Sequence, residues 1–149
     1  IDADAVETAA EAYEAELLAL DGEIESLVEG IPAEKRVLIT NHEVFGYFAD
    51  RYGFEVAGAI IPSGSTLPGA SAGELAALAD LVRDEGVPAI FSDTSASDEL
   101  AQTLAAEVGG EVALVELFTE SLGDADSGGA TYLEMVRTNG ERIAAALAS

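Results

Sequence analysis

Two side chains that could bind a metal ion follow short apolar runs of the chain. His42 is the only histidine, and it follows the run that ends at Asn41, while Glu120 follows a run that ends at Phe118. An imidazole and a carboxylate at one edge of a fold supply half of a four-coordinate zinc-type site, which needs two further donors. A lone histidine is also commonly a structural hydrogen-bonding group, and an acid in an acidic chain is commonly just solvated. Position favours the metal hypothesis only when the two residues are taken together.

Asp93 is a third candidate because it follows the apolar run of residues 88–92. An aspartate in that place could accept a phosphoryl group, with an acid cluster after the first strand for magnesium and a lysine at another strand end. Here the sole lysine, Lys35, precedes the first strand, and His42 follows that strand. Phosphotransfer is therefore the least favoured of the functions considered.

Other enzyme signatures are missing from the sequence. There is no Gly-x-Ser-x-Gly motif for a nucleophilic serine. The glycine-rich segment 123–129 has neither the Gly-x-Gly-x-x-Gly pattern nor a Walker lysine, which makes it a connector. The chain has no cysteine, which excludes disulfides, thiolate metal sites and cysteine nucleophiles. None of these enzyme classes is therefore favoured.

The charge of the chain excludes several partners. Six basic residues stand against 29 acidic ones, for a formal net charge of −23. Nucleic acids and anionic membrane surfaces are bound through Lys and Arg, so neither is an expected partner. The acids are spread along the whole chain, which favours adaptation to high salt over a localised surface that attracts cations. We expect the protein to come from a halophile.

The chain of 149 residues suits one domain and is short for two. No apolar run approaches the ~20 residues that cross a bilayer. The first residue is Ile1 and no signal peptide is present, so we expect a piece of a longer protein. Residues 4–28 carry apolar side chains at helical spacing, from Tyr13 and Leu17 to Leu27, and Gly30 with Pro32 ends that pattern. This long helix has no sheet of its own to cover, so we expect it to reach another part of the protein.

Strands and helices alternate after the long helix. This order predicts an α/β fold, in which a four-stranded parallel sheet is flanked by helices. Ligands bind such sheets beyond the carboxyl ends of the strands, where His42, Asp93 and Glu120 all stand. The expected strands are 36–41, 55–61, 88–92 and 111–118; the expected helices are 43–52, 71–85 with a Ser71–Glu74 capping box, 98–108 capped by Ser97, and 131–147; residues 63–70 form a loop.

The ordered motifs of the chain resemble those of the zinc and manganese group of ABC solute receptors. The resemblance is strongest at residues 39–48, Ile-Thr-Asn-His-Glu-Val-Phe-Gly-Tyr-Phe, and it covers essentially the whole chain. The other segments that carry it are 31–36, 51–56, 71–75, 87–92, 117–122, 131–135 and Asn139.

The resemblance implies two α/β lobes joined by one rigid helix, with the metal held between the lobes. Residues 1–30 would be that backbone helix and residues 31–149 the C-terminal lobe, with the N-terminal lobe outside the chain. His42 falls on the third ligand position of the family and Glu120 on the fourth, where aspartate is more common. Two histidines of the N-terminal lobe would complete the site. Asp93 replaces a glutamate usual in the family, and its implied role is structural or supporting.

The implied function is transition-metal uptake, with Zn²⁺ favoured over Mn²⁺ because the third position is histidine. The implied partners are the permease subunits of an ABC importer, and the implied receptor is an extracytoplasmic, membrane-anchored monomer. An alternative is a helix-linked receptor for a metal chelate or cofactor, which would not need His42 as a ligand.

Overall fold

The computed structural model describes residues 2–61, 71–94, 97–110 and 112–148. The helices are α1 (Ala3–Glu29), α2 (Gly46–Tyr52), α3 (Ala72–Glu85), α4 (Glu99–Val108) and α5 (Tyr132–Leu147), with a short 3-10 turn η1 (Ala33–Lys35). The strands are β1 (Val37–His42), β2 (Glu55–Ile61), β3 (Ala89–Asp93) and β4 (Ala113–Leu117). The expected loop 63–70 lies outside the described residues.

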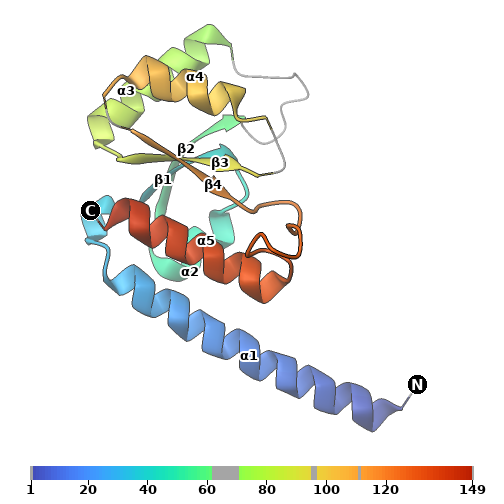
Figure 1. The fold of residues 1–149 in the computed structure, drawn as a ribbon. Coiled ribbons are helices and arrows are strands. Elements are labelled where there is room, and N and C mark those ends of the chain that lie inside the picture. Colours follow the sequence, from blue (N-terminus) through green and yellow to red (C-terminus); the bar gives the residue numbers. More distant parts are fainter. Residues whose placement is uncertain (1, 62–70, 95–96, 111, 149) are drawn as a thin grey trace.

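The four strands form one parallel sheet in the order β2-β1-β3-β4. Helices α3 and α4 cover one face, and α2, α5 and the C-terminal half of α1 lie on the other (Figure 1). The expected α/β fold with a four-stranded parallel sheet is therefore confirmed. Short apolar strands suit a sheet covered on both faces, because each face buries alternate side chains.

Two apolar layers hold the sheet between its helices. Leu38 and Phe91 point to the layer shared with α1, α2 and α5, and Ile39 and Ile90 point to the layer shared with α3 and α4. Each of these four side chains is at most 1% exposed. Side chains of one strand alternate between faces, so this pattern also sets the face on which the residues at the strand ends lie.

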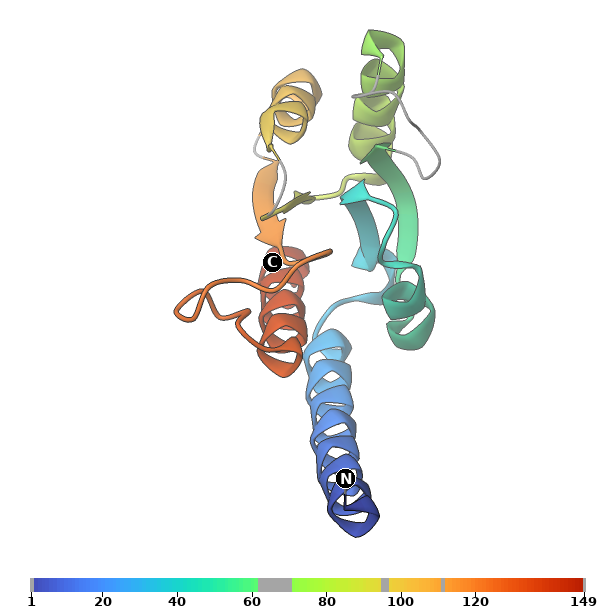
Figure 2. The ribbon, with the colours of Figure 1, turned by 90° about the vertical axis from the view of Figure 1, so that its right-hand side faces the viewer.

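Helix α1 packs on the lobe only with its C-terminal half. Leu20, Ile24 and Val28 are buried, and Ile24 meets α5 at Gly140, where a Cβ would lie 2.4 Å from Ile24 Cδ1. Residues 3–16 are exposed, and that half of α1 extends away from the lobe in both views (Figures 1 and 2). Of the expected apolar stripe, Tyr13 is 44% exposed and contributes nothing to the core.

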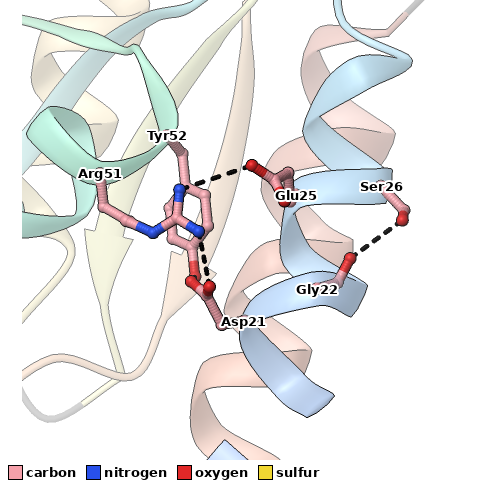
Figure 3. Close-up of polar contacts among 6 residues, drawn as sticks. All are labelled: Asp21, Gly22, Glu25, Ser26, Arg51 and Tyr52. Carbon is pink, nitrogen blue, oxygen red and sulfur yellow. Dashed lines mark hydrogen bonds and ion pairs between the residues drawn. The ribbon is translucent and has the colours of Figure 1, made fainter. Parts of the chain in front are cut away.

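Polar side chains connect α1 to α2 (Figure 3). Arg51 Nη2 lies 2.5 Å from Asp21 Oδ2, and the Tyr52 hydroxyl donates to Asp21 Oδ1 at 2.8 Å. Arg51 Nη1 also lies 3.5 Å from Glu25 Oε1. Helix α2 follows β1, the strand that ends at His42. These contacts therefore connect the long helix α1 to the element that comes directly after that strand.

Two helix starts differ from the sequence-based expectation. Helix α2 begins at Gly46 and not near Glu43, because the backbone N–H of Val44 donates to the carbonyl of His42 at 3.0 Å and forms a turn there. The N-cap of α4 is Asp98, one residue after Ser97, whose hydroxyl accepts from the Glu99 N–H at 3.3 Å. The Ser71–Glu74 capping box is confirmed. No helix in the described part of the chain is long and apolar enough to cross a membrane.

Candidate metal centre

His42 is the last residue of β1, and the chain is held firmly where that strand ends. The His42 carbonyl accepts the hydroxyl of Thr40 at 2.8 Å and the N–H of Val44 at 3.0 Å. Two hydrogen bonds to one carbonyl fix the turn that follows the strand. The imidazole is half-buried, so it is oriented by its surroundings and still accessible to an ion.

Glu120 stands three residues after β4, and α5 determines where this segment runs. The side-chain amide of Asn139 donates to the Phe118 carbonyl at 2.6 Å and accepts the Phe118 N–H at 2.9 Å. Asn139 is 6% exposed, so these bonds replace water at a buried stretch of backbone. The Phe118 ring lies against Gly129, where a Cβ would come within 2.9 Å of three ring atoms. The exposed carboxylate of Glu120 therefore extends from a backbone that α5 and the loop before it hold in place.

Asp93 ends β3, the strand that lies between β1 and β4. Its side chain is 2% exposed, and the hydroxyl of Thr119 donates to its Oδ2. Thr119 immediately precedes Glu120, so this bond joins the end of β3 to the segment that carries Glu120. This contact agrees with a structural or supporting role for Asp93, which stays a prediction.

The structure brings His42, Asp93 and Glu120 together. One ligand atom from each residue can be chosen so that all three lie within 4.8 Å of one another. One imidazole and two carboxylates form a donor set that suits divalent transition metals. The sequence-based pair His42 and Glu120 thus lies at one edge of the sheet, with Asp93 between them in strand order.

Sequence reasoning assigned no role to two residues that shape this edge, Thr119 and Asn139. Asn139 carried a signal only as part of a family-like motif, and Thr119 carried none beyond its position before Glu120. Asp93 was noticed, but its proximity to the other two depends on the strand order. The phosphotransfer hypothesis fares worse here, because the Asp93 side chain is 2% exposed and Lys35 lies in η1, before the sheet begins.

The fold is that of a solute-binding type of lobe, an α/β unit that bears a long helix and groups three side chains that could bind a metal ion at its strand ends. Residues 1–146 match the family of the periplasmic component A of the zinc-uptake complex, ZnuA. The chain belongs to this family of binding proteins, which are not enzymes.

Individual relatives agree with that assignment. The zinc-binding protein TroA of Treponema pallidum is 39% identical over 93% of this chain and 46% of its own length. The manganese-binding lipoprotein MntA of Halalkalibacterium halodurans is 31% identical over 87% of this chain and 42% of its own. The solved structure of the Treponema pallidum protein superposes with a TM-score of 0.83 at 37% identity, over 93% of this chain and 51% of that one. The chain thus spans about half the length of the relatives it matches.

Proposed function

We propose that this chain is one lobe, with its connecting helix, of an extracytoplasmic receptor that delivers zinc or manganese to an ABC importer. The observation that carries the proposal is the gathering of His42 and Glu120, with Asp93, at the carboxyl edge of a parallel sheet. Relatives are named as metal-binding proteins, and several as lipoproteins of metal ABC transporters. The relatives' names support a membrane-anchored receptor whose partner is the permease of such an importer.

The proposed site is completed by a second lobe that supplies two further donors. Residues 1–30 are the helix that joins the lobes, and residues 31–149 are the lobe that carries His42 and Glu120. Two features support this division: residues 3–16 of α1 are exposed and extend beyond the lobe, and the chain spans under half of its curated relatives. Exposed apolar side chains near the site, Val44, Tyr47, Leu122 and Tyr132, offer a surface for the second lobe.

Zinc is the favoured ion in this proposal because His42 supplies an imidazole, and a closed site without an open coordination position suits carriage and not catalysis. The receptor works as a monomer, and the net charge of −23 on this chain keeps nucleic acids away and suits a saline environment. A receptor for a metal chelate is the second candidate, but no observation of the described residues favours it over a bare ion.

The test is calorimetric titration of the full-length receptor with Zn²⁺ and Mn²⁺, in high salt, beside its His42→Ala and Glu120→Ala variants. We expect the wild-type protein to bind zinc tightly and both variants to lose at least about tenfold in affinity, since even supporting residues of metal sites cost that much. Glu85→Ala is the matched control, because Glu85 is an exposed carboxylate at the end of α3. It precedes the amino end of β3, whereas the proposed site lies at the carboxyl ends of the strands. Equal zinc affinity in all four proteins would contradict the proposal.

A further inference from the structure

The position of Asp93 in the sheet places its side chain beside that of His42. Thr40 of β1 is level with Phe91 of β3, so His42 and Asp93, each two residues further on, are level as well. Neighbouring strands lie about 4.8 Å apart, and side chains at the same level point to the same face. Leu38 and Phe91 show which face this is, because both contact the layer that α2 and α5 cover.

The Asp93 carboxylate is also held towards Glu120. The Thr119 hydroxyl donates to Asp93 Oδ2 from the residue that immediately precedes Glu120. A carboxylate offers about four lone-pair positions on its two oxygens, so the hydrogen bond from Thr119 does not by itself exclude metal coordination. The Asp93 side chain is thus 98% buried and hydrogen-bonded by Thr119. One of its oxygens lies within 4.8 Å of a donor atom of His42 and of a donor atom of Glu120.

We propose that Asp93 is a third metal-binding residue of this lobe, which contacts the same ion as His42 and Glu120 and raises the affinity for manganese relative to zinc. This inference rests on the proposed metal-receptor function. Zinc prefers four nitrogen, sulfur or oxygen donors in a tetrahedron, whereas manganese favours oxygen donors and a larger coordination number. A second carboxylate in the lobe therefore adds more to manganese binding than to zinc binding and offsets the zinc preference that His42 provides.

A supporting role is the competing explanation, in which Asp93 only orients His42 or the Glu120 segment. Residues of that kind affect metal affinity through the ligands they hold. Removal of a supporting residue weakens the binding of zinc and of manganese alike. It leaves the coordination number of the bound ion unchanged. The two explanations therefore differ in the ratio of the two affinities and in the spectrum of the bound metal.

The experiment is Asp93→Asn in the full-length receptor, because asparagine has the same size and its carbonyl oxygen still accepts the Thr119 hydroxyl. Competition titrations with Mn²⁺ and Zn²⁺ should show a manganese affinity reduced at least about tenfold and a smaller loss for zinc. With Co²⁺ as a probe, the visible absorption should intensify in the variant, as the ion moves towards four-coordination. Equal losses for both ions with an unchanged cobalt spectrum would overturn the inference.

A measurement on the wild-type protein keeps the inference testable if the variant fails to fold. In a structure of the zinc-loaded or manganese-loaded receptor, an Asp93 oxygen should bond directly to the ion, at about 2.0–2.2 Å for zinc. A bound ion that contacts His42 and Glu120 but not Asp93 overturns the inference and leaves the proposed function intact. A wild-type receptor that binds neither ion overturns both.

Discussion

At the scale of single residues, the amide of Asn139 determines how the chain runs towards Glu120. Both of its hydrogen bonds go to the backbone of Phe118, across 21 positions of sequence, and all the groups involved are buried. Loss of one partner from a buried hydrogen bond costs about 1–3 kcal/mol, because the group that remains is neither bonded nor hydrated.

Asn139→Ala should therefore lower the free energy of unfolding by at least about 2 kcal/mol, since it leaves both the N–H and the carbonyl of Phe118 without this partner. The measurement is urea unfolding of the metal-free protein at neutral pH. Gln102→Ala is the matched control, because its exposed amide donates to Asp98, the N-cap residue of α4, and its loss should fall within about 0.5 kcal/mol. Comparable losses in both variants would contradict the assigned importance of the buried amide.

Tyr52 gives a second prediction at this scale. Burial, together with its hydrogen bond to Asp21, raises the pKa of Tyr52 to about 12. The neutral phenol is thus favoured in the folded state, so its contribution to stability is complete below pH 10 and is lost as the pH rises through about 12. The nearby Arg51 guanidinium acts in the opposite direction, but it does not cancel the effect.

In alkaline unfolding experiments, the wild-type protein should lose stability more steeply between pH 10 and 12 than Tyr52→Phe, which has no phenol to ionise there. Tyr47→Phe is the control, because the Tyr47 side chain is 95% exposed, and it should follow the wild-type curve. If the wild-type and Tyr52→Phe curves are parallel over this range, burial and the hydrogen bond to Asp21 do not have the assigned effect on the pKa of Tyr52.

At the scale of elements, two glycines on helices test how closely α1 and α5 approach. A Cβ at Gly140 of α5 would lie 2.4 Å from Ile24 Cδ1, and Ile24 is fully buried, so that methyl group has little room to move. A Cβ at Gly22 of α1 would meet nothing within 4 Å. The same substitution should therefore have opposite effects at these two positions.

Gly140→Ala should destabilise the protein by about 1–3 kcal/mol through overpacking. Gly22→Ala should stabilise it by about 0.5–1 kcal/mol, because alanine loses less backbone entropy in a helix interior. Thermal and urea unfolding of both variants measure the difference. A stabilising Gly140→Ala would mean that the two helices are not held at the observed separation.

At the scale of the whole molecule, the charge of −23 affects stability more than any ion pair does. The described salt bridges, such as Arg137–Glu23 at 2.8 Å, are half-exposed, and pairs of that kind contribute about 0–1 kcal/mol. Repulsion among the acids is longer-ranged, with a screening length of about 10 Å at 0.1 M salt and about 3 Å at 1 M. Added salt should therefore relieve more repulsion than it removes attraction.

The midpoint of thermal unfolding should rise by more than about 4 °C between 0.1 M and 2 M KCl, which corresponds to roughly 1 kcal/mol in a domain of this size. Glu7, Glu11 and Glu14 lie one turn apart on the exposed half of α1, where like charges repel. A variant with glutamine at all three positions should show a shallower dependence on salt. A midpoint that falls with KCl would contradict adaptation to a saline environment.

The sequence by itself determined the elements of this protein and the side chains that could bind a metal ion. Apolar periodicity, the capping box at Ser71 and glycines after helices are local signals, so the order of strands and helices follows from them. His42 and Glu120 could be selected because both follow strands, and the carboxyl ends of parallel strands share one edge. Local signals also placed Tyr13 in an apolar stripe, but they could not say which half of the helix meets the lobe.

Only the tertiary structure decided which of these side chains meet. In the order β2-β1-β3-β4, strand β3 lies between β1 and β4. Asp93 at the end of β3 therefore lies between His42, which ends β1, and Glu120, which follows β4. The bonds of Asn139 to Phe118 likewise join segments 21 residues apart. Such contacts depend on strand order and helix packing, which are set by the burial of the whole apolar surface and leave no periodic signal in the chain.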